Sequence, residues 1–195
     1  MKRIAYLFIF DGFADWEPAH ALCQINRSGR FEVVTAGFSC KPISSMGGLK
    51  LTPDVILDDM NSAEAAIFIL PGGDMWGRAK HERVAVILRR LQTENVPIAA
   101  ICAATLEIAR AGLTHGVRHT SNSKEYLKAK VPDYRDEKFY VDELAVTGHN
   151  IITASGLGSL EFARTVITHL GIHSPSDTAL WFDMFKHGVL PAGIA

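Results

Sequence analysis

The sequence predicts an α/β fold in which helices cover both faces of a mostly parallel sheet. Two observations support this prediction. Continuous apolar runs, such as residues 4–10 and 65–70, alternate with segments of helical periodicity, and such runs are typical of strands buried on both faces. A strand, a helix and a second strand also fit within residues 4–36, which matches a βαβ unit with a right-handed crossover.

Turn-forming and capping residues mark where the first strand, the first helix and the second strand begin and end. The apolar run at 4–10 stops at Asp11-Gly12, and Asp15 is a suitable N-cap for the helix that follows. That helix ends at Ser28-Gly29, and residues 31–36 form the second strand. The amino-terminal run superficially resembles a signal peptide, but it lacks a small-residue cleavage site, so a buried first strand is expected.

The middle of the chain contains two more strand–helix pairs after an irregular region. Residues 39–60 are punctuated by proline and glycine, with room for a short hairpin near residues 43–51. After the strand at 65–70, residues 78–93 have helical periodicity with an apolar face. Another short apolar run, 96–101, leads into a helix that a glycine terminates.

In the carboxyl-terminal part of the chain, the sequence pattern predicts shorter helices and strands. In order, these are a strand at 118–120, a charged helix at 124–130, two β segments within 139–154, a helix at 160–170 and a last helix capped by Ser176. The last helix is apolar enough to dock on another surface. Because no repeat, low-complexity segment or linker divides the chain, a single domain is expected.

The composition is that of an ordinary globular protein. The chain has 195 residues, of which 48% are apolar and 21% charged, and its formal net charge is -1. This balance gives no reason to expect nucleic acid or an anionic membrane as a partner. No apolar run approaches the ~20 residues of a membrane span.

The three cysteines, Cys23, Cys40 and Cys102, lack the spacing of a disulfide framework. Their odd number favours reduced thiols in a cytoplasmic protein. The sequence also lacks the Cys-x-x-Cys and His-Glu-x-x-His patterns of metal sites, as well as the glycine patterns of dinucleotide and phosphate loops. Neither a metal nor a cofactor is therefore expected.

Cys102 lies where the apolar run at 96–101 gives way to a helix rich in Ala, Leu and Glu. Such a turn directs its central side chain outward, and the positive end of the helix dipole favours the thiolate. The alternative is a buried cysteine that acts as a small hydrophobe. The turns at 11–17 and 71–77 also follow strands, and parallel sheets bind ligands at their carboxyl ends, which favours the reactive thiol.

Two nearby turns offer partners for such a thiol. Gly72 and Gly73 allow close backbone approach, so the N–H groups of Gly73 and Ala103 would bind a developing oxyanion if the loops are neighbours. The alternative is an ordinary turn that uses glycine for its conformation. Glu17, next to a tryptophan, would have a raised pKa and hydrogen-bond a thiolate, or it would only favour the dipole of its helix.

The eight histidines are scattered along the chain. His119, on the short strand predicted after the Cys102 helix, is the best candidate to reach the thiol. The alternative is a structural or exposed histidine.

Four segments together resemble the ThiJ/PfpI superfamily, which has a class I glutamine amidotransferase-like fold. This family includes intracellular proteases or amidases and the Parkinson's-disease-associated deglycase. The segments fall in family order between residue 2 and about residue 170. They are residues 11–17 (DGFADWE), 70–73 (LPGG), 100–105 (AICAAT) and 152–163 (ITASGLGSLEFA).

The resemblance implies a flavodoxin-like three-layer sandwich. It implies one domain at 1–195, with a core at about 2–171 and a carboxyl-terminal helix and tail at 174–195 that is a candidate interface. Cys102 would occupy the nucleophile elbow and Glu17 would be the protonated acid bonded to it. Gly73 and Ala103 would be the backbone donors, and the protein would form a homodimer.

The chain departs from the family's pattern in two ways. Ala103 stands where the protease branch has a histidine, and the downstream His-x-Glu of glutamine amidotransferases does not occur. A Cys–His–acid protease and a glutaminase are therefore poorly supported. His119 as base, or Tyr134 or Asp136 lining the pocket, are the alternatives for a third member of the site.

Three functional hypotheses follow. The first is a cysteine-dependent enzyme, protease/amidase-like or glyoxalase/deglycase-like, in which Cys102 attacks a small carbonyl, amide or peptide and Glu17 relays a proton. The second is a redox-sensing or stress-protective protein with an oxidisable Cys102 and no dedicated turnover. The third is a non-catalytic dimeric scaffold. The expected protein is cytoplasmic and homodimeric in each case.

Overall fold

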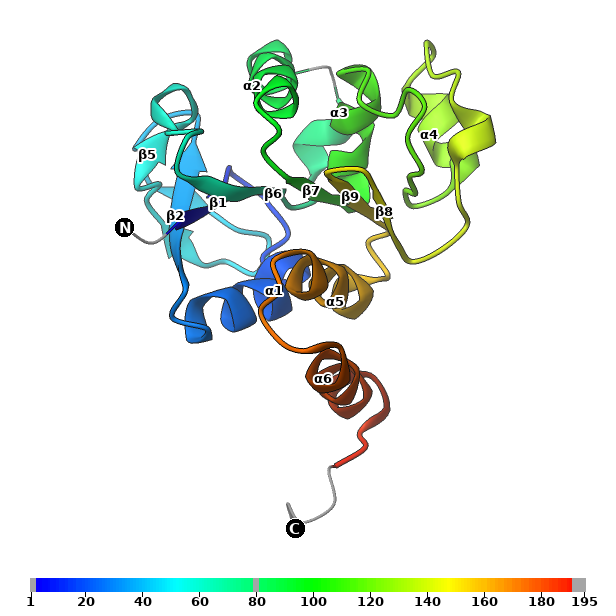
Figure 1. Ribbon diagram of the computed structural model, residues 1–195. Coiled ribbons are helices and arrows are strands. Elements are labelled where there is room, and N and C mark those ends of the chain that lie inside the picture. The colour runs from blue at the N-terminus through cyan, green and yellow to red at the C-terminus, as the bar shows by residue number, and fades with distance from the viewer. Residues whose placement is uncertain (1–2, 79–80, 191–195) are drawn as a thin grey trace.

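The computed structural model describes residues 3–78 and 81–190 and has the predicted α/β architecture (Figure 1). Within these ranges the main sheet has seven strands in the order β5-β2-β1-β6-β7-β9-β8. The pairs are parallel except for β8 and β9 at one edge. The strands are β1 (Arg3–Phe8), β2 (Phe31–Gly37), β5 (Val55–Ile56), β6 (Ala65–Leu70), β7 (Ile98–Ile101), β8 (Ala145–Gly148) and β9 (Ile151–Ala154).

Helices cover both faces of the sheet, so the molecule has the three layers of a flavodoxin-like sandwich. In Figure 1, α1 and α5 lie below the sheet, α2 and α3 lie above it, and α6 packs on the outer side of α5. The α-helices are α1 (Trp16–Arg27), α2 (Glu82–Thr93), α3 (Thr105–Arg110), α4 (Lys124–Lys130), α5 (Ser159–His169) and α6 (Pro175–His187).

The core is centred on the inner strands β1, β6 and β7. Every residue of β6 and β7 is buried, because helices on both faces leave no side of these strands in water. The ring of Trp76, fully buried, lies 5.8 Å from Phe8 and 5.3 Å from Phe10, measured between ring centroids. Burial of each such side chain contributes about 1.5–3 kcal/mol, so this packing fixes the loop that follows β6.

Several sequence predictions are confirmed. The hairpin expected near residues 43–51 is the antiparallel pair β3 (Ile43–Ser44) and β4 (Lys50–Leu51). The two β segments expected within 139–154 are β8 and β9.

Other predictions are wrong. Residues 118–120 form no strand, because His119 pairs with the facing segment through a single bridge to Tyr140. The helix expected at 78–93 begins at Glu82, since the chain first forms the short 3-10 helix η2 (Asp74–Gly77); residues 79–80 of that prediction lie outside the described ranges. The tail residues 191–195 also lie outside them.

Two predicted caps also differ from the structure. The Asp15 carboxylate accepts a hydrogen bond from the Ser45 hydroxyl at 2.6 Å and makes no cap bond to α1. Ser174, not Ser176, caps α6, since its hydroxyl oxygen accepts from the N–H of Asp177. The Ser45 hydroxyl thus occupies the Asp15 carboxylate, and Ser174 is the residue whose hydroxyl reaches the first turn of α6.

Candidate active site

Cys102 lies in the turn between β7 and the short 3-10 helix η3 (Cys102–Ala104). Its φ angle is +60°, in the left-handed region that residues other than glycine seldom adopt. Such a conformation costs roughly 1–3 kcal/mol and persists only where the surrounding structure holds it. The buried Ala103 and Ala104 hold the turn in place. Cys102 itself is half-buried and lies at the carboxyl end of β7.

Glu17 approaches the same point from the first turn of α1. Its side chain is only 1% exposed, and its Oε2 accepts a hydrogen bond from the Gly72 N–H at 2.5 Å. Burial raises the pKa of Glu17 to about 7, although hydrogen bonds from the Gly72 N–H and from Cys102 oppose the shift. The carboxyl group therefore exchanges its proton near neutral pH.

Glycine is required at position 72 because the side chains of Glu17 and Cys102 both lie close to its backbone. A Cβ atom at this position would lie 2.7 Å from Glu17 Oε2 and 2.8 Å from Cys102 Cβ, so any side chain would separate the two groups. The Gly72 N–H donates to the Glu17 carboxyl, whereas the sequence predicts Gly72 as part of the oxyanion-binding turn. Its role is to hold the acid against the thiol.

Gly73 and Ala103 lie at the pocket that contains the sulfur. The Gly73 N–H has no hydrogen-bond acceptor among the described residues, and the Ala103 N–H is directed at the Cys102 sulfur. Both residues line a pocket of about 210 Å³ together with Cys102 and Glu17. The other side chains around it are those of Ala14, Trp16, Met46, Asp74, Asn122 and Tyr126.

Asn122 is a member of this site that sequence reasoning missed. Its amide Nδ2 donates to Cys102 Sγ at 3.5 Å, and its Oδ1 accepts from the Gly156 N–H at 2.9 Å. The Gly156 position must also stay free of a side chain, because a Cβ there would lie 2.8 Å from Sγ. The polar run at 120–123 was the available signal, but nothing local shows that it returns to the thiol.

The thiol and the carboxyl group form a coupled pair. Burial and, second, the charge of Glu17 raise the pKa of Cys102 to about 11, while the hydrogen bonds from Asn122 and Ala103 lower it. The sequence predicts a thiolate favoured by the helix dipole, but burial outweighs that effect here. Between about pH 7 and about pH 11 the pair holds one proton, and the sulfur is a thiolate whenever Glu17 carries it.

His119 lies outside the residues that line this pocket. It is 1% exposed, its Nδ1 lies 2.7 Å from the Val117 carbonyl oxygen, and its Nε2 lies 2.6 Å from the Tyr134 hydroxyl. Both ring nitrogens are therefore engaged away from the sulfur. Burial lowers the pKa of His119, so the ring is neutral at pH 7.

Tyr134 and Asp136 belong to the same separate cluster. The Asp136 carboxylate accepts from the Thr114 hydroxyl at 2.7 Å and contacts His115. Neither Tyr134 nor Asp136 lines the pocket at Cys102. The three alternatives for a third member are thus held elsewhere, and the structure places Asn122 beside the sulfur.

Among the described residues, no group of three or more His, Cys, Asp or Glu side chains has the arrangement of a metal site. The described helices also include none with the length and apolar character needed to cross a bilayer. The exposed Cys23 and Cys40 take no part in the pocket.

Comparison with known proteins shows the family to which the chain belongs. The family model described as DJ-1/PfpI family matches residues 2–169. A Bacillus subtilis protein named "Uncharacterized protease YoaZ" is 35% identical over 192 residues, which cover 94% of this chain and 91% of the relative. A Caenorhabditis elegans "Glutathione-independent glyoxalase" is 31% identical over 73% of this chain and 75% of its own length. The "Deglycase PfpI" of Pyrococcus furiosus is 30% identical over 56% of this chain and 66% of its own length.

Solved structures show the same fold. A thiJ/pfpI family protein from Bacillus anthracis superposes with a TM-score of 0.90 at 32% identity, covering 97% of this chain and 92% of that chain. A DJ-1 superfamily protein from Agrobacterium tumefaciens superposes with a TM-score of 0.87, also at 32% identity, covering 96% and 99%.

Proposed function

Because this chain belongs to the DJ-1/PfpI family, we propose that it is a cysteine-dependent enzyme acting on a small reactive carbonyl or amide. One observation carries the proposal: Cys102 is held at φ +60° beside the buried Glu17, in a pocket that Gly73 and Ala103 also line. The relatives named protease, glyoxalase and deglycase support an enzyme. The small pocket favours a small substrate over a long peptide.

In the proposed reaction, the pair begins with its single proton on Glu17. The thiolate of Cys102 forms a bond to the carbonyl carbon, and the π electrons move to the oxygen. The N–H groups of Gly73 and Ala103 stabilise this oxyanion, each contributing on the order of 3–4 kcal/mol. With a 2-oxoaldehyde, the Glu17 proton then passes to the oxyanion and gives a hemithioacetal. The Glu17 carboxylate moves a proton from the hemithioacetal carbon to the neighbouring carbon, and water hydrolyses the resulting thioester to a 2-hydroxy acid and frees Cys102.

With an amide substrate, the same intermediate breaks the C–N bond instead. The Glu17 proton leaves with the amine, and a thioester remains on Cys102. Water then hydrolyses the thioester, which releases the carboxylic acid and returns one proton to the pair. Glu17 is the proton carrier in this scheme because no histidine among the described residues contacts the sulfur.

Substitution of the nucleophile tests the proposal. We expect Cys102→Ala and Cys102→Ser to lower turnover of methylglyoxal or of a small amide by at least about 10³-fold. Cys23→Ala, which removes an exposed thiol outside the pocket, is the matched control and should keep wild-type activity. Full activity of Cys102→Ala would eliminate the proposal.

A redox-sensing role is the second candidate. It is favoured by the donors at the sulfur, because Asn122 Nδ2 and the Ala103 N–H would also stabilise a sulfinate. Two successive reactions with hydrogen peroxide would each transfer one oxygen atom to the sulfur and release water. Intact-mass analysis distinguishes the candidates: two oxygens gained at Cys102 alone, without turnover of any tested substrate, supports the sensor. Equal oxidation of Cys23 and Cys40 contradicts it.

A further inference from the structure

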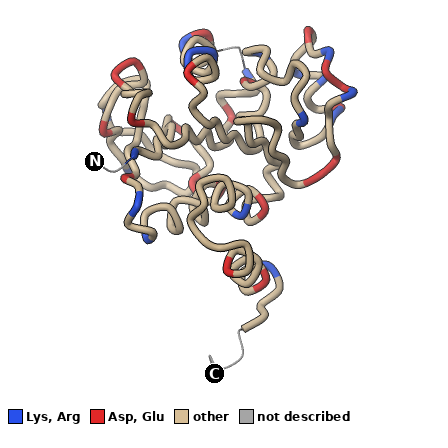
Figure 2. The backbone as a smooth tube through the Cα atoms, viewed as in Figure 1, with Lys and Arg blue, Asp and Glu red and all other residues tan. Residues whose placement is uncertain are grey.

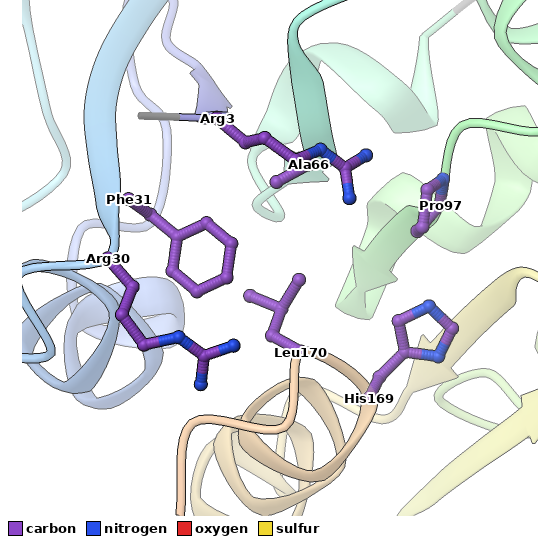
Figure 3. A pocket seen from close by; sticks show the side chains of 7 residues that line it. All are labelled: Arg3, Arg30, Phe31, Ala66, Pro97, His169 and Leu170. Carbon is purple, nitrogen blue, oxygen red and sulfur yellow. The ribbon is translucent and has the colours of Figure 1, made fainter. Parts of the chain in front are cut away.

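A second hollow lies at the amino ends of the parallel strands, whereas Cys102 lies at their carboxyl ends. It has a volume of about 330 Å³, and its rim carries three nitrogen-bearing side chains, those of Arg3, Arg30 and His169 (Figure 3). Pro97, which precedes β7, also lines it, whereas Cys102 follows β7. One strand of this length separates the two sites by roughly 15 Å.

Both guanidinium groups are fixed by the main chain. Arg3 Nη2 donates to the Ala65 carbonyl oxygen at 2.6 Å, and Arg30 Nη1 donates to the carbonyl oxygen of Gly171. The Arg30 guanidinium also lies 5.4 Å from the centroid of the Phe31 ring. Since a guanidinium has five N–H donors, each arginine retains several donors after these contacts.

The positive charge at this hollow lacks a matching carboxylate. Neither Arg3 nor Arg30 forms an ion pair among the described residues, and no Asp or Glu lines the hollow. Glu32 follows Phe31 in β2, but successive strand side chains point to opposite faces. Figure 2 shows basic residues gathered at the start of β1 and at the turn between α1 and β2.

We propose that this hollow binds a phosphate monoester with a small apolar group. One guanidinium fork comes from the first residue of β1 and the other from the turn before β2, and a tetrahedral phosphate has enough oxygens to accept from both. A carboxylate would be satisfied by one fork alone. The apolar group of the ligand would lie against Phe31, Pro97 and Leu170, which form the remaining walls.

His169 completes the recognition without adding charge. It ends α5 and points into the hollow beside Pro97 (Figure 3). Burial lowers the pKa of His169, so at neutral pH the ring is neutral and donates through one nitrogen. The partial negative charge at the end of α5 disfavours an anion, but Arg30 already binds the carbonyl oxygen of Gly171 just beyond it.

Titration of the full-length protein with phenyl phosphate tests this site. We expect saturable binding by calorimetry with a dissociation constant of about 1 mM or lower. Arg3→Gln and Arg30→Gln should each weaken binding by about tenfold. Arg118→Gln removes the same charge from an exposed position outside the hollow and is the matched control. Cys102→Ser should leave the affinity for phenyl phosphate unchanged, because the two sites lie at opposite ends of the parallel strands.

A second measurement avoids the variants altogether. In the wild-type protein, the Nε–H resonances of Arg3 and Arg30 and the ring signals of His169 should shift on addition of phenyl phosphate. Benzoate, which offers a carboxylate on the same ring, should bind more weakly. The proposal is overturned by an absence of saturable binding, by tighter binding of benzoate, or by an equal loss in Arg118→Gln.

Discussion

At the scale of single residues, the site depends on one proton shared by Cys102 and Glu17. The Gly72 N–H holds the carboxyl group, and burial keeps it protonated up to about pH 7. Because the sulfur and the carboxyl group cannot both be negative at neutral pH without a large repulsion, loss of the first proton creates one anion only. That anion is mainly the Glu17 carboxylate, and the nucleophile is the smaller fraction of the pair in which Glu17 keeps the proton and the sulfur is the anion.

Glu17→Gln should therefore change the ionisation of the thiol. In the wild type we expect thiolate absorbance, and the rate of alkylation, to rise with pH in two steps, near pH 7 and near pH 11. Glutamine carries no charge, so the variant should show a single step between these values. Two unchanged steps in Glu17→Gln would show that the carboxyl group is not coupled to Cys102.

Asn122 should matter through the sulfur and not through folding. Asn122→Ala removes the donor to Sγ and the acceptor of the Gly156 N–H. We expect kcat/KM and the alkylation rate of Cys102 at pH 7 to fall by about tenfold. Asn150→Ala, at an exposed turn, serves as the control. An unchanged alkylation rate in Asn122→Ala would remove Asn122 from the site.

At the scale of elements, the loop after β6 is held by α3. Arg110 Nη1 donates to the Trp76 carbonyl oxygen at 2.7 Å and lies 3.5 Å from a carboxylate oxygen of the fully buried Glu107. The Trp76 ring in turn donates to the Pro71 carbonyl oxygen at 2.9 Å. This chain of contacts fixes the Gly72-Gly73 turn relative to the helix that follows Cys102.

Arg110→Gln should loosen that connection. We expect the free energy of unfolding to fall by up to about 3 kcal/mol, because burial already raises the pKa of Glu107 and the variant removes the cation that opposes this shift. In the folded fraction, kcat should fall more than the apparent affinity for substrate, since the Gly73 N–H acts on the oxyanion. Arg89→Gln breaks a surface ion pair and should change stability by less than about 1 kcal/mol. A variant Arg110→Gln with wild-type stability and kcat would refute the connection.

Strands could be predicted from the sequence where both of their faces are buried. The apolar runs at β1, β6 and β7 identified strands because helices cover both their faces. Cys102, Glu17 and the Gly72-Gly73 turn could be assembled because parallel strands bring their carboxyl ends together. The place of Asn122 depends on how residues 111–123 return to the sheet, and no local pattern encodes that path.

At the scale of the whole molecule, α6 presents apolar side chains to solvent. Leu180 is 41% exposed and Phe185 51% exposed, while the neighbouring Trp181 and Phe182 pack against the core. The sequence predicts a homodimer with residues 174–195 as the candidate interface. The exposed apolar side of α6 is the part of that segment that a second copy would cover.

Introduction of a charge on α6 tests this assembly. We expect a dimer by size-exclusion chromatography with light scattering, and a monomer for Leu180→Glu, because a buried unpaired carboxylate is costly. Val86→Glu introduces the same change at an exposed position of α2 and should leave the dimer intact. A monomeric wild type, or equal dissociation of Val86→Glu, would contradict the prediction.

The two edge strands of the main sheet limit how two copies of the protein can associate. One margin is β5, only two residues long, after which η1 (Leu57–Asp59) turns the chain away; the other is β8, four residues long. Short edge strands leave few unpaired backbone groups for another molecule to extend the ladder. We therefore expect copies that associate through helical surfaces to keep their sheets separate, and concentrated solutions to resist fibrillar stacking.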